Sequence, residues 1–270
     1  MSATSNDKVA VEIDGDGVAW VTLNEPEVRN ALSPELRAQF TERIPALEFD
    51  PAVRCVVIQG AGDHFMAGGD IRIMRERLKM DPNERSRRIL AGLHDLHHAI
   101  FAIRRMPKPV IASVRGAAAG FGLSLVAATD LAIAADDAVF TLAYCHIAAS
   151  PDGGASYFLG RTLGMKQQME LAFLGERFGA AKAKELGIVN WVTPKADLQA
   201  ETAKLAKQLA HGPTRAYANA KALFNASNHL TMESQLQMEA ERIADSMATA
   251  DHAEGVNAFL DKRKPNFIGR

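Results

Sequence analysis

The sequence lacks the features that mark disulfide-bonded, membrane-spanning or nucleic-acid-binding proteins. It has only two cysteines, Cys55 and Cys145, and each lies in an apolar run without the spacing of metal ligands. No apolar run reaches the ~18 residues of a membrane span, and the polar residues 1–7 contain no apolar signal core. The formal net charge of −1 gives no reason to expect nucleic acid or an anionic membrane as the main partner. We therefore expect a reduced, cytoplasmic protein that holds no metal and binds neither nucleic acid nor membrane.

The sequence also lacks long linkers, low-complexity tracts and internal repeats. Its 270 residues are enough for one large α/β domain or for one domain with an appendage. Strand-like and helix-like runs alternate up to about residue 195, and only helical periodicity follows. This division predicts an α/β core over residues 1–195 and a helical region over residues 196–270, which packs on the core or on a neighbouring subunit.

Local patterns predict where the elements of the core lie. Residues 9–13 and 18–23 alternate apolar and polar side chains around an Asp-Gly-Asp-Gly turn, which predicts a β-hairpin. Ser33 and Pro34 fit the cap and the first position of a helix that ends near residue 47. Further strands are expected at 54–59, 109–114, 131–134, 138–142 and 187–192, and helices within 71–107 and at 120–128, 155–163, 165–174 and 180–185.

Two glycine-rich segments are the main candidates for function. Residues 65–71 read Phe-Met-Ala-Gly-Gly-Asp-Ile, and residues 116–122 read Gly-Ala-Ala-Ala-Gly-Phe-Gly. Each follows an apolar strand-like run, so each can expose backbone N–H groups at a strand end. Two such groups that converge on one carbonyl oxygen form an oxyanion hole, which needs no special side chain. A tight turn that needs glycine for packing alone is the alternative for the second segment.

The second segment also reads G-x-x-x-G-x-G, a dinucleotide-binding pattern of short-chain dehydrogenases, and Tyr217 and Lys221 supply a Tyr-x-x-x-Lys. Three observations argue against a dehydrogenase. The glycine pattern begins after residue 110, whereas that fold opens with it. No serine lies between Ser156 and Tyr217 to complete the tyrosine–lysine site. The chain after the glycine pattern lacks the alternating strands of a doubly wound sheet.

Several motifs, in order along the chain, resemble those of the crotonase (enoyl-CoA hydratase/isomerase) family. Residues 24–32, Asn-Glu-Pro-Glu-Val-Arg-Asn-Ala-Leu, resemble its N-terminal signature, and residues 65–71 resemble its F-x-A-G-x-D-[IL] motif. The stretch from Lys108 through Gly122 to Asp130 is similar to its central signature. Further matches occur at 164–165, 180–187 and 258–263, so the resemblance covers nearly the whole chain.

The resemblance implies an α/β fold with a crotonase-like spiral ββα core, a C-terminal helical trimerisation region and acyl-CoA thioester substrates. It implies a homotrimer or hexamer, and no cofactor, because coenzyme A is part of the substrate. The amides of Gly69 and Phe121 fall at the family's oxyanion positions, where each donor is typically worth ~3 kcal/mol of barrier. The positions implied to bind CoA or substrate are Arg29, Ala67, Gly69, Asp70, Ile71, Arg72, Tyr144, Phe259 and Lys262, the last two from a neighbouring subunit. A solvated surface charge is the alternative for Arg29, Arg72 and Lys262.

The resemblance also bears on which reaction is expected. Hydratases of the family use two glutamates to activate water, and those positions here hold Ser124 and Tyr144. No glutamate occurs between Gly116 and Gln168, so the paired-carboxylate site is absent from its usual place. Simple hydration is therefore not the expected main activity.

One acidic residue, Asp152, follows in Pro-Asp-Gly-Gly-Ala. Isomerases of the epoxyphenylacetyl-CoA type carry a similar P-D-x-G-G with the aspartate as base, although Ala155 departs from it. A dehalogenase branch uses an aspartate here as nucleophile inside an aromatic cage. Tyr144 and His97 resemble parts of that cage, but its tryptophans are missing. A helix N-cap is the structural alternative for Asp152.

Two histidines have the spacing of metal ligands on one helix face. His94 and His98 are four residues apart with Asp95 beside the first, as in a zincin helix, but no third ligand follows. A polar helix face is the better interpretation, with His97 available to line an acyl pocket. The sequence thus predicts an enoyl-CoA isomerase in which Asp152 moves a proton between C2 and C4, with Gly69 and Phe121 as oxyanion donors. A hydratase of fatty-acid or aromatic-acid degradation and a non-catalytic acyl-CoA binder are the alternatives.

Overall fold

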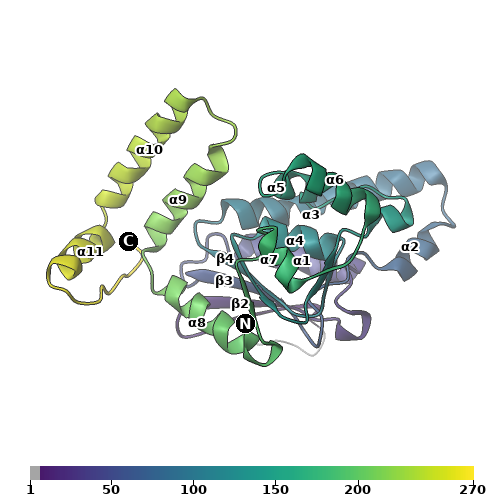
Figure 1. Ribbon diagram of the computed structural model, residues 1–270, viewed down its shortest axis with the longest axis horizontal. Coiled ribbons are helices and arrows are strands. Elements are labelled where there is room, and N and C mark those ends of the chain that lie inside the picture. Colours follow the sequence, from purple (N-terminus) through teal and green to yellow (C-terminus); the bar gives the residue numbers. More distant parts are fainter. Residues whose placement is uncertain (1–6) are drawn as a thin grey trace.

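A computed structural model describes residues 7–270 of the chain (Figure 1). Its centre is a six-stranded sheet in the order β1-β2-β3-β4-β6-β9. The first two strands pair antiparallel as the expected hairpin, and all other neighbours in this sheet are parallel. The strands are β1 (Val9–Ile13), β2 (Val18–Leu23), β3 (Cys55–Gly60), β4 (Val110–Val114), β6 (Leu131–Ala135) and β9 (Trp191–Thr193).

A second sheet has three strands, in the order β5-β7-β8. Its strands are β5 (Ala117–Ala119), β7 (Val139–Thr141) and β8 (Phe178–Gly179). β5 pairs parallel with β7, and β7 pairs antiparallel with β8. Because β5 lies inside the second glycine-rich segment, that segment belongs to a sheet as well as to a turn.

Both faces of the large sheet are covered, because successive side chains of a strand point to opposite faces. On β3, Val56 and Ile58 join the main core under the helices α1 (Pro34–Ala46), α3 (Pro82–Arg105) and α4 (Phe121–Ala128). Cys55 and Val57 point the other way, into a smaller core completed by α8 (Leu198–Ala210). Ser33 caps α1 as expected, since its hydroxyl accepts from the Leu36 N–H at 3.0 Å.

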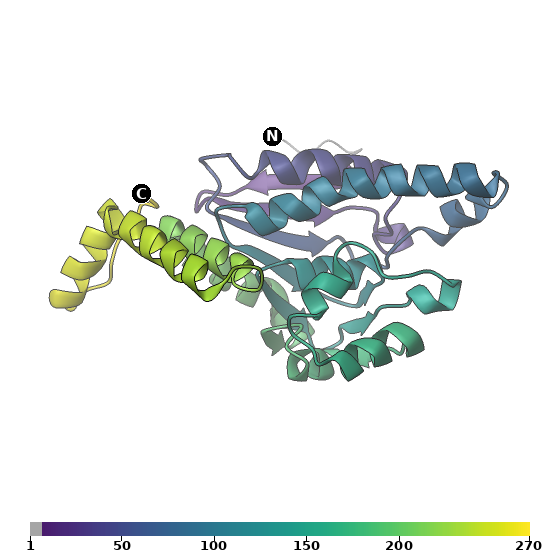
Figure 2. The same cartoon turned by 90° about the horizontal axis from the view of Figure 1, so that it is seen from above.

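The last helices project from the core as a separate arm (Figures 1 and 2). They are α9 (Thr214–Ala226), α10 (Met232–Met247) and α11 (Ala250–Leu260). α9 is fixed to the core by Lys221, whose ammonium contacts Asp130 at 2.6 Å and the Ile103 carbonyl oxygen at 2.7 Å. The boundary at 195/196 stays a prediction, but α8, just after it, lies on the sheet and not in the arm.

The remaining short elements connect these layers. They are η1 (Pro26–Val28), α2 (Ile71–Arg77), η2 (Tyr144–Ile147), α5 (Ala155–Leu159), α6 (Met165–Leu174), α7 (Ala180–Glu185) and η3 (Lys195–Asp197). No helix among residues 7–270 is long and apolar enough to cross a bilayer.

Two local expectations were wrong. The strand expected at 187–192 is β9, Trp191–Thr193, because Gly187 ends α7 with a φ of +73° and the buried Ile188 and Val189 pack into the main core. The helix expected at 155–163 ends at Leu159. The pattern of apolar residues shows that both segments are buried, but it does not determine how their backbones are hydrogen-bonded.

Candidate active site

Asn30 holds the first glycine-rich segment in place. This residue has a left-handed φ of 55° and is fully buried. Its side-chain amide donates to the carbonyl oxygens of Ala61, His64 and Phe65 at 2.8–3.2 Å, and its side-chain oxygen accepts from the Glu25 N–H at 2.9 Å. A single asparagine thus satisfies the backbone of the turn between β3 and the segment, where buried carbonyl groups would otherwise lack partners.

The two glycine-rich segments lie directly side by side. The Met66 N–H donates to the Ala117 oxygen, and the Ala119 N–H donates to the Met66 oxygen, both at 2.9 Å. Gly68 has a φ of +88°, and a Cβ there would lie 2.8 Å from the Ala119 oxygen. A Cβ on Gly122 would lie 2.3 Å from the Met66 oxygen. Glycine is therefore required at both positions by the close approach of two backbones.

Gly69 and Phe121 each carry an uncommitted N–H in the second half of a glycine-rich segment. Phe121 is the first residue of α4, so its N–H has no partner inside the helix. Gly69 directly precedes Asp70, the N-cap of α2. Within residues 7–270, neither N–H donates a hydrogen bond. The terminal methyl of Met74 lies over Gly69, since a Cβ on Gly69 would be 2.3 Å from it.

The carboxylate of Asp152 is bound by a tyrosine. The Tyr144 hydroxyl donates to its Oδ1 at 2.6 Å, and the hydroxyl oxygens of Tyr144 and Ser124 are 3.0 Å apart. Burial raises the pKa of Asp152, while the Tyr144 hydrogen bond and the nearby charge of His97 lower it and offset only part of the rise. Burial and the facing carboxylate also raise the pKa of Tyr144 above its usual range, so Tyr144 stays a neutral donor.

Asp152 is not the cap of the helix that follows it. The N-cap of α5 is Gly154, and no side chain caps this helix. Gly153 and Gly154 both have positive φ, +60° and +82°, and turn the chain sharply after Asp152. A Cβ on Gly153 would lie 2.6 Å from the ring of Phe121. The turn that carries Asp152 therefore rests on the first residue of α4.

The expected CoA-binding residues of the N-terminal half lie together around the first segment. The Ala67 N–H donates to the Arg29 oxygen at 2.9 Å, so these two residues are neighbours. Asp70 accepts from the Arg72 N–H at 2.8 Å and pairs with its guanidinium at 2.7 Å. The hydrogen bonds from Arg72 hold the pKa of Asp70 below its usual value. Arg72 and Ile71 are exposed, whereas Asp70 is buried as a helix cap.

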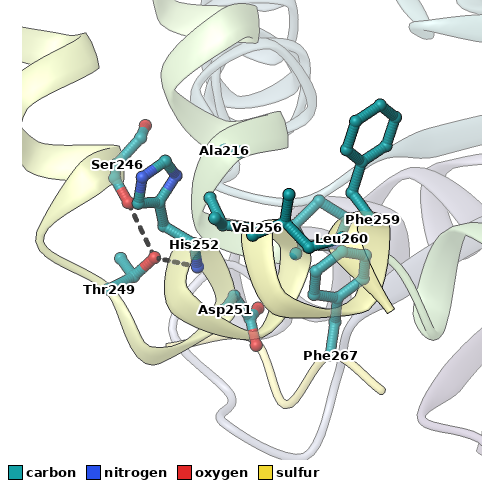
Figure 3. Close-up of a pocket in the computed structure, with 11 residues that line it drawn as sticks. Ala216, Ser246, Thr249, Asp251, His252, Val256, Phe259, Leu260 and Phe267 are labelled. Atoms are coloured by element: carbon teal, nitrogen blue, oxygen red, sulfur yellow. Dashed lines mark hydrogen bonds between the residues drawn. The ribbon is translucent and has the colours of Figure 1, made fainter. Parts of the chain in front are cut away.

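Phe259 and Lys262 lie elsewhere, at the end of the projecting arm. Phe259 is 84% exposed and borders a cavity of about 400 Å³ between α9, α11 and the C-terminal segment (Figure 3). Thr249, at the same cavity, caps α11 by accepting from the His252 N–H at 3.0 Å. Within one chain the arm lies on the opposite side of the core from α2 (Figure 1), so these two residues are not brought to the glycine-rich segments. Their contribution from a neighbouring subunit stays a prediction.

Comparison with known proteins decides the family. The sequence model of the family described as enoyl-CoA hydratase/isomerase matches residues 14–270. The chain belongs to the enoyl-CoA hydratase/isomerase family. A probable enoyl-CoA hydratase of Rhodobacter capsulatus is 35% identical over 94% of this chain and 96% of its own. The 1,2-epoxyphenylacetyl-CoA isomerase of Escherichia coli is 34% identical over the same shares. A crystal structure of an enoyl-CoA hydratase from Polaromonas sp. JS666 matches with a TM-score of 0.88 and 38% identity, covering 96% of this chain and 99% of that one.

This membership confirms the crotonase-like α/β fold with its C-terminal helical region, and it makes the chain an acyl-CoA enzyme of the enoyl-CoA hydratase/isomerase family. The sequence indicates Asp152, Tyr144 and Ser124 as separate site positions, but not the hydrogen bonds that join them. The signal for this contact in the sequence is that the three polar residues lie between apolar stretches. Their contact depends on the left-handed Ala143, with a φ of 58°, which redirects the chain before Tyr144 and which no residue preference announces.

Proposed function

We propose that this enzyme moves the double bond of an enoyl-CoA thioester through an enolate. The Asp152 carboxylate takes a proton from C4 of a 2-enoyl thioester. The C4–H electron pair becomes a C3=C4 bond, the C2=C3 pair becomes C1=C2, and the carbonyl pair moves onto the thioester oxygen. When the carbonyl re-forms, the C1=C2 pair takes the proton from Asp152 at C2 and yields the 3-enoyl thioester.

The Gly69 and Phe121 N–H groups supply the second part of this proposal. They would donate to the thioester oxygen as its negative charge grows, and such donors are worth most where water is excluded. Phe121 is 2% exposed, and both N–H groups are free of other hydrogen bonds within residues 7–270. The CoA portion of the substrate would then lie along Arg29, Ala67 and the stretch from Gly69 to Arg72.

The observation that carries the proposal is the contact between the Asp152 turn and α4. Gly153 lies on the ring of Phe121, so the base and one oxyanion donor belong to touching residues. The raised pKa of Asp152 is closer to the value that suits a group which both accepts and donates a proton, because the protonated form then persists at higher pH. The relative named 1,2-epoxyphenylacetyl-CoA isomerase supports isomerisation within the family.

Hydration is the second candidate, supported by the relative named probable enoyl-CoA hydratase. In that reaction Asp152 would be the one carboxylate available to activate water, because Ser124 and Tyr144 carry none. Both side chains are already hydrogen-bonded to each other and to Asp152 or Gly120. A single carboxylate suits proton transfer better than the two-carboxylate positioning of water, which is why isomerisation is preferred.

We also propose that the enzyme is a homotrimer or hexamer formed through the arm. Large apolar side chains on α10 and α11 are exposed in the single chain, which is typical of a surface that another subunit covers. These are Met232, Leu236, Ile243, Met247, Val256, Phe259 and Leu260. Assembly would bring Phe259 and Lys262 to a neighbour's CoA. Light scattering that gives the mass of one chain would contradict this.

The test is incubation with straight-chain and ring-containing enoyl-CoA esters in deuterated water, followed by mass spectrometry and NMR of the products. Isomerisation predicts a shifted double bond without added water, together with deuterium at C2 or C4 to the extent that the Asp152 proton exchanges with solvent before it is returned. Formation of a 3-hydroxyacyl product would favour the hydratase. Binding of the esters with neither a shifted double bond nor deuterium uptake would favour a non-catalytic binder.

A further inference from the structure

A chain of hydroxyl groups connects the base of the proposed isomerase to its oxyanion hole. The Tyr144 hydroxyl is 2.6 Å from Asp152 Oδ1, the Ser124 hydroxyl is 3.0 Å from that of Tyr144, and the Ser124 hydroxyl reaches the Gly120 oxygen at 3.3 Å. Gly120 and Phe121 share one peptide group. The carbonyl at the end of this chain therefore belongs to the same peptide as the Phe121 N–H.

We propose that Tyr144, supported by Ser124, is a positioning residue that holds Asp152 for proton transfer and couples it to the Phe121 peptide. This inference rests on the proposed function for its catalytic meaning, but the hydrogen bonds themselves do not. Neither hydroxyl touches the reacting atoms. Both act through the groups at the two ends of the hydroxyl chain, the Asp152 carboxylate and the Gly120–Phe121 peptide.

The direction of the hydrogen bonds follows from counting protons. When Asp152 is ionised it can only accept, so Tyr144 donates to it and Ser124 is left to donate to Tyr144 or to the Gly120 oxygen. When Oδ1 carries a proton, Asp152 can donate to Tyr144, Tyr144 to Ser124, and Ser124 to the Gly120 oxygen. Each hydroxyl keeps its proton and only rotates, so no covalent bond changes.

The second arrangement strengthens the donor at the moment when it is needed. The Gly120 carbonyl already accepts from the Ser124 N–H at 3.1 Å. A second hydrogen bond to that carbonyl polarises the peptide further and makes the Phe121 N–H a better donor, because hydrogen bonds in a chain reinforce one another. Asp152 is protonated while the enolate exists, so protonation of the base and stabilisation of the enolate support each other. When the Asp152 O–H turns from Tyr144 to deliver its proton to C2, the hydroxyl groups return to the first arrangement.

The two hydroxyl groups lie where apolar packing alone would not require them. Ser124 is fully buried, and a buried hydroxyl is unfavourable without a hydrogen-bond partner, so Ser124 depends on Tyr144 and the Gly120 oxygen. The ring of Tyr144 lies against Gly120, where an added Cβ would be 3.9 Å from Cζ. Two polar side chains are thus inserted into an apolar region at the site of the base.

Two titratable groups face Asp152: Tyr144 from η2 and His97 from α3. Both lower the pKa of Asp152 against the effect of burial, Tyr144 by a hydrogen bond and His97 by its charge. Removal of the Tyr144 hydroxyl should therefore raise the pKa of Asp152. Because the ionised form is the base, the acidic limb of the rate profile should move to higher pH.

The experiment compares Tyr144→Phe and Ser124→Ala with the unmodified enzyme. The titration of Asp152 is followed by carboxyl 13C NMR, with the Asp152 signal assigned by its loss in Asp152→Asn. Tyr157→Phe is the matched control, because the hydroxyl of this exposed tyrosine forms its hydrogen bond at the surface, with His229 Nε2 at 2.8 Å. We expect a higher pKa of Asp152 in Tyr144→Phe, a smaller rise in Ser124→Ala, and no change in the control.

Kinetics give the second readout. Loss of either hydroxyl should lower kcat for double-bond migration by about tenfold with little change in KM, as expected for a hydrogen bond to a charged group that matters in the transition state. An unchanged Asp152 titration in Tyr144→Phe overturns the inference, and if that variant does not fold, an unchanged titration and kcat in Ser124→Ala do so. If the pKa moves but no enoyl-CoA is isomerised by the unmodified protein, the proposed function fails and the positioning role stands.

Discussion

Gly153 lies directly against the aromatic ring of Phe121. An added Cβ on Gly153 would be 2.6 Å from Cδ2 and 2.7 Å from Cε2 of that ring, and Phe121 is only 2% exposed. The ring has no room to retreat, so this contact fixes the distance between the Asp152 turn and the start of α4. Gly153 directly follows Asp152, the proposed base, and Phe121 carries one proposed oxyanion donor. The contact therefore links these two groups.

Gly153→Ala should therefore impair catalysis more than binding. The substitution forces a side chain into a residue with a φ of +60° and against a buried ring, a combination that costs about 1–3 kcal/mol of strain. We expect kcat to fall by about tenfold or more, measured by product formation at saturating thioester. Gly179→Ala is the control, because Gly179 has a φ of −84° and nothing within 4 Å of an added Cβ. Equal activities of the two variants would refute the role of the contact.

Met74 should govern which acyl groups reach Gly69. Its terminal methyl covers Gly69 while the side chain is 39% exposed, so it is a flexible cover and not part of the core. Met74→Ala should improve kcat/KM for ring-containing esters relative to short straight-chain esters, by about tenfold if one contact of methyl size is relieved. Met169→Ala, on α6 and 41% exposed, tests for a general effect of losing a methionine. An unaltered ratio in Met74→Ala would show that Met74 does not restrict the site.

Asp152→Asn should stabilise the protein at neutral pH. Burial raises the pKa of Asp152 in the folded state above its ordinary value, so the protonated form is favoured by folding and ionisation destabilises the fold. The disadvantage of the native aspartate is present above the folded-state pKa and disappears as pH falls toward the ordinary value of 3.8. Thermal unfolding of both proteins across pH should show a higher Tm for the variant at pH 7 and converging values in acid. A lower Tm for the variant at pH 7 would contradict this sign.

The contact between Lys221 and Asp130 should fix the arm to the core. The Lys221 side chain is 9% exposed, and its ammonium lies 2.6 Å from the Asp130 carboxylate. Asp130→Asn leaves a buried charge without its counter-charge, which costs about 3–5 kcal/mol. Urea unfolding should show this loss, and limited proteolysis should cut more readily near α9. Glu239→Gln, an exposed acid on α10, is the control. A loss no larger than that of the control would mean that the pair contributes little.

Much of this architecture could be predicted from the sequence because it depends on local rules. The hairpin, the Ser33 cap and the buried β3 follow from alternation, capping and apolar runs. The close approach of the two glycine-rich segments could be expected from Gly68 and Gly122, which leave room where a Cβ would meet a backbone oxygen. Motif order then identified the family, which the comparisons confirmed.

Other features could not be predicted because they depend on contacts between distant residues. The three alanines of β5 carry no strand pattern, and they form a strand because Met66 and Val139 pair with them. The first residues of the strand expected at 187–192 form a turn instead, because Gly187 has a positive φ and Ile188 is buried in the main core. The chain from Ser124 to Asp152 joins residues 28 positions apart and requires the left-handed Ala143. Backbone reversals of this kind have no reliable signature in the side chains.

The most direct test of the central claim measures proton exchange by Asp152 within one bound thioester. An enoyl-CoA ester that the enzyme isomerises is mixed in deuterated water with the unmodified enzyme or with Asp152→Asn, and deuterium at C2 and C4 is followed by mass spectrometry while calorimetry gives the Kd. The account predicts rapid exchange with the aspartate, a loss of about 100-fold or more with the asparagine, and similar affinities. Equal exchange by both proteins would contradict it.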